Sequence, residues 1–349
     1  MHPRTWLFYF FSLTLILALP IVIFNYWMDP LWTFSHSHAY NQNQVGFNER
    51  QLKTNKMYFN GLKKYDALLL GSSRSTYINQ ADFNGMKVFN LASADMTPYE
   101  YKEWIEIAKK IKNEEFKYII IGLDFWASNK YLTQKKIVQN KTPNSYLNRA
   151  KELLYRYKSL ISFDTFQKSR ENLKHQEEAS TIDYTRDNIK NTILVSPERK
   201  KHVSILQYNK YKNTIYGKDY IYDMNLKQLF LELKKANPKT KFIIFTTPIS
   251  KTLFSLLIKQ GNYIHYKNWM RATIDVFSEV HNFMGINKIT VNPRNYPDLH
   301  HFYPFVGKVI AKNISSANKK MKKYTPATIV NKNNIENYFK QQDKLYTGF

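Results

Sequence analysis

Three polar residues in two distant segments could carry nucleophilic chemistry. Ser73 lies in "LLLGSSRSTY", where small and polar residues follow directly on an apolar run, and Asp298 and His301 lie in "YPDLHHFYPFVG". A serine hydroxyl is a poor nucleophile at neutral pH, so it needs a base within hydrogen-bond reach and a carboxylate that fixes the tautomer of that base. The spacing Asp298-x-x-His301, just before a predicted helix, supplies both groups from one turn. An ordinary strand-to-helix turn around Ser73 is the alternative interpretation.

A parallel sheet would bring these two segments together. Short apolar runs predict buried strands at residues 65–70, 87–91, 117–125, 241–248 and 287–292. Helical spacing of apolar residues and start signals predict helices at residues 98–113, 225–237, 263–282 and 304–319. Apolar strands that alternate with amphipathic helices are typical of a parallel sheet covered on both faces, where functional residues gather at the carboxyl ends of the strands. We therefore expect Ser73 and His301 to meet at one edge of this sheet.

Polar residues also follow the second and third predicted strands. The second is followed by "NLASADMTPYE", which contains Asn90, Ala94 and Asp95, and the third ends in "GLDFW" with Asp124. These residues are candidates for the lining of the site. Arg74, which follows the candidate nucleophile, either supplies a hydrogen-bond donor to the site or pairs structurally with Asp124.

The sequence contains few signals for a metal or a cofactor. His300 and His301 are adjacent, so only one is expected to face inward, and the spacing favours His301. No H-x-x-x-H pair or carboxylate cluster accompanies them, and the His36-x-His38 pair has no third ligand nearby. The chain has no cysteine, which excludes disulfides, thiolate zinc sites and cysteine nucleophiles. We expect neither a metal nor a cofactor.

The order and spacing of the strand-end segments resemble the SGNH, or GDSL-type, hydrolase superfamily. The likeness is greatest to its membrane-anchored branch, which includes envelope acyl-transfer proteins of the D-alanylation and alginate-acetylation kind. The resemblance implies a three-layer α/β/α, flavodoxin-like fold over residues 63–320, with Ser73 as the nucleophile, His301 as the base and Asp298 as the orienting carboxylate. It also implies a serine esterase or O-acyltransferase that acts on glycans or polymers of a bacterial cell envelope, together with a membrane protein that donates the acyl group.

Two positions differ from the pattern of this superfamily. The second motif has Ala94 or Asp95 in place of a glycine, and the third has Asp124 in place of an asparagine. In the family, the glycine N–H and the asparagine amide help the serine N–H to bind the oxyanion, whereas an ionised aspartate only accepts hydrogen bonds. Losing one oxyanion donor typically costs about 100- to 1,000-fold in rate. The alternative function is therefore a catalytically inactive protein of the same fold that binds polysaccharide or assists envelope assembly.

The N-terminal segment predicts a membrane anchor. Residues 6–28 form a run of 23 residues without a charge. As a helix rising about 1.5 Å per residue, this run would cross a hydrocarbon layer of roughly 30 Å. It is longer than a typical signal-peptide core and no A-x-A-like site follows it, so we predict an uncleaved anchor. Arg4 before the span and Asp29 after it favour a single-pass topology with the N-terminus inside and the main domain outside the cytoplasm.

The charge balance predicts an anionic partner. The chain contains 52 Lys and Arg residues against 27 Asp and Glu, a net charge of +25 at pH 7. Anionic lipid and an anionic or acylated envelope glycan both fit this charge. Nucleic acid fits it as well, but it conflicts with the anchor and the chain has no recognisable binding module. A membrane-surface scaffold that uses only its charge is a third class of function.

The remaining segments complete the predicted organisation. Residues 129–215 interrupt the alternation of strands and helices, and "NRAKELLYRYKSLI" within them has the pattern of one basic amphipathic helix. This insertion is either a solvated segment or a face that docks on an anionic bilayer or polymer. The predicted parts of the chain are a cytoplasmic stub (1–5), an anchor (6–28), a connecting segment (29–62), the SGNH-like domain with its insertion (63–320) and a loosely ordered basic tail (321–349).

Overall fold

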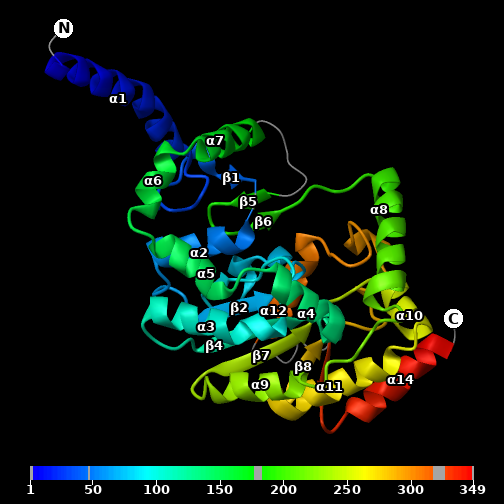
Figure 1. Ribbon diagram of the computed structural model, residues 1–349. Helices are drawn as coiled ribbons and strands as arrows, with labels where there is room; N and C mark the ends of the chain where they lie inside the picture. The colour runs from blue at the N-terminus through cyan, green and yellow to red at the C-terminus, as the bar shows by residue number, and fades with distance from the viewer. Residues whose placement is uncertain (1–2, 46–47, 177–182, 317–326, 348–349) are drawn as a thin grey trace. The chain divides into compact units, whose positions relative to one another are not determined.

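Two compact units make up the computed structural model of the chain (Figure 1), which describes residues 3–45, 48–176, 183–316 and 327–347. Unit 1 consists of Met1–Gly61 and Asn144–Ile193, and unit 2 consists of Leu62–Pro143 and Leu194–Phe349. The predicted boundaries differ from these. The expected connecting segment folds together with the middle of the expected insertion, while both ends of that insertion belong to the unit that contains the large sheet.

Unit 1 combines helices with a small antiparallel sheet. Its helices are α1 (Pro3–Met28), α2 (Glu49–Asn60), α5 (Pro143–Lys151), α6 (Tyr155–Ile161) and α7 (Phe163–His175). Its sheet has the order β1 (Asn43–Gln44), β5 (Asp183–Thr185), β6 (Lys190–Asn191). The prediction of one continuous basic helix over residues 148–161 is wrong. The helix α5 ends at Lys151, and Leu154, directly before α6, has a φ of +61°, a left-handed conformation that a continuous helix does not contain.

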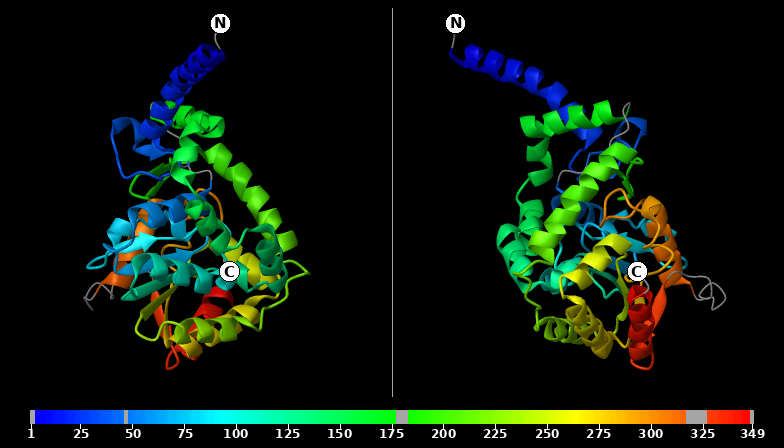
Figure 2. Two further views of the ribbon diagram at one scale, coloured as in Figure 1. Left: turned by 60° about the vertical axis from the view of Figure 1, so that its left-hand side comes forward. Right: turned by 90° about the vertical axis from the view of Figure 1, so that its right-hand side faces the viewer.

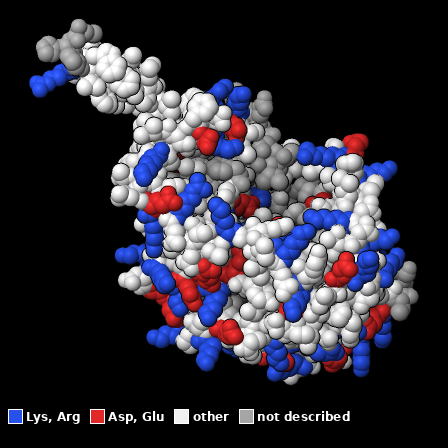
Figure 3. All heavy atoms as spheres, in the orientation of Figure 1, with Lys and Arg blue, Asp and Glu red and all other residues white. Residues whose placement is uncertain are grey.

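The helix α1 is long and apolar enough to cross a membrane, by its length and composition. Figure 3 shows it as a rod with few charged side chains, and Arg4 is the only charged residue within it. Its last turn is different, because Asn25 is fully buried in unit 1. The Asn25 amide donates to the carbonyl oxygens of Leu160 and Ser162 at 2.8 and 3.2 Å, and its oxygen accepts from Ser169 at 2.9 Å. The end of α1 is therefore built into unit 1.

A buried ionic cluster lies beside the small sheet of unit 1. The Glu49 carboxylate accepts hydrogen bonds from Lys190 at 2.8 Å and from the Tyr184 hydroxyl at 2.6 Å. Lys53 is buried next to this group, and burial lowers its pKa to about 7, although Glu49 acts in the opposite direction. Burial would raise the pKa of Glu49, but the two lysines outweigh it and lower the pKa to about 2.

The low pKa of Lys53 predicts that unit 1 becomes more stable as the pH rises above 7. Folded Lys53 loses its proton near pH 7, whereas an unfolded lysine keeps it to about pH 10, so the unfolded state binds more protons in this window. The free energy of unfolding should therefore rise by up to about 3 kcal/mol between pH 7 and pH 9. Lys53→Met should remove this rise in urea denaturation of the full chain. An equal pH response in Lys53→Met and in the exposed control Lys102→Met would contradict the prediction.

A six-stranded sheet forms the centre of unit 2. Its strand order is β3 (Val88–Asn90), β2 (Ala67–Gly71), β4 (Tyr118–Leu123), β7 (Lys241–Thr246), β8 (Glu279–Asn282), β9 (Thr328–Asn331). The first five strands in this order are parallel, and only β9 runs antiparallel to its neighbour. When the five parallel strands are numbered by their order along the chain, they lie side by side in the sheet in the order second, first, third, fourth, fifth. The sheet is therefore doubly wound. The expected α/β class with a mainly parallel sheet is confirmed.

Helices cover both faces of this sheet. Ala67, Leu69 and Ile120 pack in one apolar cluster with Val306 and Ile310 of α12 (Pro304–Ser315). The intervening strand residues are equally buried and point to the opposite face, as alternation in a strand requires. The helix α9 (Leu226–Lys235) contacts α3 (Pro98–Lys112) on one side and α11 (Tyr263–Phe277) on the other. This double coverage explains why the central strands are continuous apolar runs.

The fifth parallel strand is not where the sequence predicted it. Residues 263–282 were expected to be one helix and residues 287–292 a strand, but α11 ends at Phe277 and β8 follows it. The helix ends because Ser278 has a φ of +74°. The segment expected to be a strand is a turn, since the Asn287 side chain accepts from the backbone N–H groups of Ile289 and Thr290 at 2.9 and 3.2 Å. Such local side-chain bonds compete with strand formation.

The prediction of a loosely ordered tail is wrong for residues 327–347. The strand β9 pairs antiparallel with β8, and α14 (Ile335–Thr347) follows it. The hydroxyl of Tyr338 in α14 accepts a hydrogen bond from the Asn282 amide of β8 at 2.7 Å, in the core. Residues 317–326, the end of the predicted last helix and the start of the tail, lie outside the described part of the chain.

The ends of the expected insertion add helices to unit 2. These are α4 (Lys130–Gln139), α8 (Pro197–Lys210) and a one-turn π-helix, η5 (Tyr211–Ile215). A further helix of unit 2, α10 (Lys251–Lys259), lies outside the insertion. None of the α8 residues is buried. Figure 2 shows α8 as one straight helix, and η5 continues it in the chain. These elements matter because they reach the carboxyl edge of the sheet, where the candidate site lies.

Candidate active site

The segment after β2 forms a tight turn that presents Ser73. Gly71, at the end of β2, pairs in register with Gly122 of β4 and has a φ of +150°. A Cβ atom on either glycine would collide with the buried hydroxyl of Ser75. The two glycines therefore leave the space in which Ser75 begins a short 3₁₀ helix, η2 (Ser75–Tyr77). Ser73 precedes this helix and stays partly exposed at the carboxyl edge of the sheet.

Ser73, His301 and Asp298 form a hydrogen-bonded series. The Ser73 Oγ lies 2.9 Å from His301 Nε2, and His301 Nδ1 lies 2.9 Å from Asp298 Oδ2. The other Asp298 oxygen accepts the backbone N–H groups of His300 and His301 at 2.8 and 2.7 Å. Burial would raise the pKa of Asp298, but the two imidazoles and these hydrogen bonds outweigh it and hold the pKa well below its usual range. An ionised Asp298 accepts from Nδ1–H, which leaves Nε2 as the acceptor that faces Ser73.

His300 also lies at the site, although only one of the two histidines was expected to face inward. Its ring centroid is 3.7 Å from that of His301 and 5.6 Å from that of Tyr211. Burial, with the nearby His301 and Arg74, lowers the pKa of His300 well below its usual value. His300 is therefore a neutral imidazole at physiological pH, and it lines the cavity beside the hydrogen-bonded series.

Asp298, His300 and His301 offer ligand atoms within 4.8 Å of one another, as a metal site would require. The Asp298 oxygens already accept the ring N–H of His301 and two backbone N–H groups. A metal ion would have to replace the bond that orients the His301 ring. The arrangement therefore fits a base held by a carboxylate better than it fits a metal centre.

Arg74 is buried and connects four neighbouring groups. Its Nε donates to the His300 carbonyl oxygen at 2.8 Å, and its Nη1 donates to Asp124 Oδ1 at 2.6 Å. The same Nη1 contacts the Thr247 hydroxyl at 3.3 Å, and Nη2 donates to the Tyr211 hydroxyl at 2.7 Å. Burial would lower the pKa of Arg74, but Tyr211 and Asp124 outweigh it and raise the pKa. Of the two interpretations left open by the sequence, the structure contains the pairing of Arg74 with Asp124.

Asp124 does not line the cavity, contrary to the prediction from sequence. Its side chain is buried and points to Arg74 and to the Thr247 hydroxyl, which donates to the same carboxylate oxygen. The guanidinium of Arg74 holds the carboxylate and balances its charge. An aspartate at this position is therefore accommodated without an unpaired negative charge at the site.

Asn90 is likewise not a cavity-lining residue. Its side chain is buried, and its amide donates to the carbonyl oxygens of Ser75 and Ile78 at 3.0 and 2.8 Å. Asn90 therefore holds the turn that follows the candidate nucleophile. It acts on the site only by positioning that turn.

The loop after β3 reaches the cavity through Asp95. Asp95 has a φ of +54°, and its carboxylate forms an ion pair with Lys136 of α4 at 2.6 Å. Ala94 is exposed in the same loop and does not line the cavity. Of Ala94 and Asp95, the two candidates in this loop, Asp95 is thus the one that lines the cavity with Ser73.

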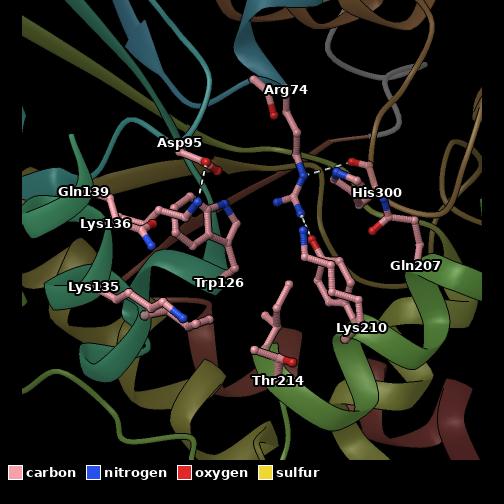
Figure 4. A pocket seen from close by; sticks show the side chains of 14 residues that line it. Arg74, Asp95, Trp126, Lys135, Lys136, Gln139, Gln207, Lys210, Thr214 and His300 are labelled. Carbon is pink, nitrogen blue, oxygen red and sulfur yellow. Dashed lines mark hydrogen bonds and ion pairs between the residues drawn. The ribbon is translucent and has the colours of Figure 1, made fainter.

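A cavity of about 300 Å³ opens beside Ser73 (Figure 4). Most of its wall comes from α4, the end of α8 and η5, which the sequence analysis treated as an insertion. The lining residues are Ser73, Arg74, Asp95, Trp126, Leu132, Lys135, Lys136, Gln139, Gln207, Lys210, Tyr211, Thr214, Ile215 and His300. Sequence reasoning missed Lys135, Lys210 and Tyr211, and the only available signal was the basic character of the insertion. Trp126 is the last residue of the quoted "GLDFW" segment, so its position at the strand end was a signal for it.

The π-helix η5 positions Tyr211 against Arg74. Burial raises the pKa of Tyr211 to about 12, although Arg74 acts in the opposite direction. Tyr211 therefore stays neutral at physiological pH, and its oxygen accepts the N–H of Arg74. Single turns of π-helix are frequent at functional sites, where they redirect one side chain.

Gly307 of α12 allows the helix to approach the nucleophile turn closely. A Cβ atom at this position would collide with the Tyr77 carbonyl oxygen and lie 3.0 Å from the Ile78 Cα. Gly307→Ala should push α12 and His301 away from Ser73 and cost about 1–3 kcal/mol of stability. We expect it to lower the midpoint of thermal unfolding more strongly than the exposed control Val309→Ala. Equal midpoints for the two variants would contradict this role.

The fold and the site together define an α/β protein with a Ser-His-Asp series at the carboxyl edge of a parallel sheet. A cavity with several cationic side chains lies beside the serine. No protein-family model matches this chain, and no curated protein matches it at a significant level. The function is therefore inferred from the geometry of the site.

Proposed function

We propose that the protein is a membrane-anchored serine esterase or O-acyltransferase of the SGNH type that acts on cell-envelope glycans or polymers. One observation carries the proposal: the Ser73 hydroxyl lies 2.9 Å from His301 Nε2, with Asp298 hydrogen-bonded behind the ring. The strand order second, first, third, fourth, fifth is that of flavodoxin-like sheets, and it supports an SGNH-like fold.

The reaction proceeds through an acyl-enzyme. His301 Nε2 takes the proton of Ser73 as the serine oxygen attacks the acyl carbonyl carbon, and Asp298 stabilises the imidazolium that forms. The tetrahedral intermediate then expels its alcohol, which receives the proton from His301. Water or a sugar hydroxyl next gives a proton to His301 and attacks the acyl-serine, and the second tetrahedral intermediate releases the acid or the transferred ester as His301 returns that proton to the Ser73 oxygen. Hydrolysis and transfer thus use the same residues.

Backbone N–H groups are the proposed oxyanion donors. The Ser73 N–H and an N–H group of the Ala94–Asp95 loop would hold the developing charge. The buried pair of Arg74 and Asp124 supports this assignment, because a charge-balanced Asp124 does not oppose an oxyanion as an unpaired carboxylate would. This feature favours the enzyme over the alternative, an inactive binding or assembly factor of the same fold.

The charge of the cavity favours a substrate with an anionic group. Lys135 and Lys210 line the cavity, and no ion pair is recorded for either with the described residues, whereas Lys136 pairs with Asp95. Cations beside a reacting centre bind carboxylate or phosphate groups. Acylated envelope polymers that carry such groups are therefore the proposed substrate class.

The helix α1 is the proposed single-pass anchor in a bacterial cell membrane. Its length and apolar surface support a spanning role. Arg4 at the start of α1 supports an inside N-terminus, with the proposed catalytic unit outside the cytoplasm.

Covalent labelling tests the proposed chemistry. A serine-directed fluorophosphonate should label the detergent-solubilised full chain, since His301 activates the Ser73 oxygen. Ser73→Ala should abolish labelling, and Ser72→Ala, which changes the adjacent buried serine, should keep it. A wild-type chain that stays unlabelled while it binds envelope polysaccharide would favour the inactive alternative.

The two cavity lysines should set the preference for charged substrates. Lys135→Ala and Lys210→Ala should each raise the KM for an anionic aryl ester by about 10-fold, because each removes one charge contact worth about 1.4 kcal/mol. The KM for a neutral aryl acetate should change little. Lys141→Ala is the matched control, because Lys141 is exposed and lies outside the cavity. Equal effects on both esters would contradict an anionic substrate.

A further inference from the structure

Two exposed apolar side chains lie at the corner where α6 meets α7 in unit 1. Ile161 is 67% exposed and Phe163 is 62% exposed. Ser162 lies between them, and its carbonyl oxygen is one of the two that accept from the Asn25 amide of α1. Single exposed apolar residues are common on proteins. Ile161 and Phe163 are distinctive because they lie next to the hydrogen bonds that hold the end of α1 to unit 1.

An apolar path connects α1 with this corner. The Phe24 ring of α1 lies 5.6 Å from the Phe166 ring of α7, and Phe166 lies 5.9 Å from the exposed Phe163. Asn25 is fully buried against α6 and α7, so the direction in which α1 leaves unit 1 is set at this corner. A bilayer that surrounds α1 up to its last turns would therefore have its surface at Ile161 and Phe163.

Basic side chains surround a hollow beside the same corner. The hollow has a volume of about 380 Å³, and Arg149, Lys158 and Lys168 line it together with the acidic Glu152 and Asp164. Over residues 143–176, which form α5 to α7, the sequence has seven Lys and Arg residues against three Asp and Glu. Basic residues next to exposed apolar side chains are typical of surfaces that bind anionic lipid headgroups.

We propose that this corner, defined as Lys158, Ile161, Phe163 and Lys168, rests on the anionic surface of the bilayer that α1 crosses. Ile161 and Phe163 enter the boundary between headgroups and acyl chains, and Lys158 contacts a lipid phosphate. Lys168, which pairs with Glu171 at 2.8 Å, adds positive charge beside it. The contact gives unit 1 a second attachment beside the anchor, so unit 1 cannot rotate freely about α1. It rests on the proposed role of α1 as the anchor and is independent of the proposed catalysis.

The absence of cysteine makes the test direct, because one introduced cysteine takes a fluorescent label at a single position. The full chain would carry an environment-sensitive dye at Ile161→Cys, Phe163→Cys or, as a control, Tyr58→Cys in α2 of the same unit. Each variant is reconstituted into phosphatidylcholine vesicles with or without phosphatidylglycerol. In the anionic vesicles, we expect blue-shifted emission and quenching by bilayer-embedded nitroxide lipids at positions 161 and 163. Position 58 should instead be quenched by aqueous iodide.

Charge reversal distinguishes binding to anionic lipid from the mere proximity of this corner to the membrane anchor. Lys158→Glu with Lys168→Glu should reduce the nitroxide quenching at position 161 at least two-fold in anionic vesicles, whereas Lys102→Glu with Lys110→Glu on α3 should leave it unchanged. Iodide quenching at position 161 equal to that at position 58 would overturn the proposal. Equal nitroxide quenching in neutral and anionic vesicles would overturn its electrostatic part. Circular dichroism of each labelled variant checks that the chain remains folded.

Discussion

Ser73→Ala is expected to lower hydrolysis of a small aryl ester by at least about 1,000-fold, because no other hydroxyl lies within reach of His301 Nε2 in the described hydrogen-bond network. His301→Ala should cost about as much, since the serine is a weak nucleophile without its base. The double variant Ser73→Ala with His301→Ala should be no slower than either single variant, because residues that act as one unit give strongly non-additive effects. Initial rates of the full chain, corrected for the uncatalysed reaction, measure all three.

Asp298→Asn tests how much the orientation of the His301 base contributes, because the Ser73 nucleophile is retained. An amide cannot stabilise the imidazolium and favours the wrong tautomer of His301, so we expect a loss of about 10,000-fold in turnover. Thermal unfolding of Ser73→Ala and His301→Ala should stay close to that of the unsubstituted chain, because Ser73 and His301 are only partly buried. A Ser73→Ala chain that keeps its full esterase rate would remove the basis of the proposed function.

Arg74→Leu is expected to destabilise unit 2 by about 3–5 kcal/mol, because it leaves the Asp124 carboxylate buried without its cation. It should also reduce the proposed ester turnover, since the Arg74 Nε holds the His300 carbonyl oxygen next to His301, the proposed base. Asp124→Leu should be destabilising for the same reason, through the unpaired guanidinium. Urea denaturation of the full chain measures the free energy of unfolding for each variant.

The double variant Arg74→Leu with Asp124→Leu provides the decisive comparison. Replacing both members of a buried ion pair by apolar residues is often close to neutral, so the stability should largely return. Turnover should stay low, because the hydrogen bond to His300 is still missing. The surface pair of Lys227 and Asp275 is the control, and its removal should change stability by less than about 1 kcal/mol. If Arg74→Leu alone left stability unchanged, the pair would not hold the site together.

The central strands could be predicted because their signal is local. β2, β4 and β7 are apolar runs that are buried on both faces, so their composition already separates them from the amphipathic helices between them. The strand β8 and its neighbour β9, at the edge of the sheet, carry no such signal. Their residues "EVHN" and "TIVN" are strands because β8 forms hydrogen bonds with β7 and β9, and β9 with β8, which depends on contacts between distant segments.

The candidate site divides in the same way. The pairing of Asp298 with His301 spans three residues, so the spacing alone predicts it, and the position of Ser73 follows from the rule that function gathers at strand ends. No local sequence pattern predicted that Tyr211 belongs to the candidate site. It reaches Arg74 from a π-helix 137 positions later in the chain.

Residue composition predicted the net positive charge, and the spacing of apolar residues along the chain predicted α1 and the parallel sheet. These properties need no knowledge of contacts between distant residues. The encounter of Ser73 with His301, 228 positions apart, depends on how β2 and α12 pack across the sheet. The balance of charge at Asp124 and the cationic wall of the cavity likewise required folding. Both are built from side chains whose distance along the chain carries no information about their distance in space.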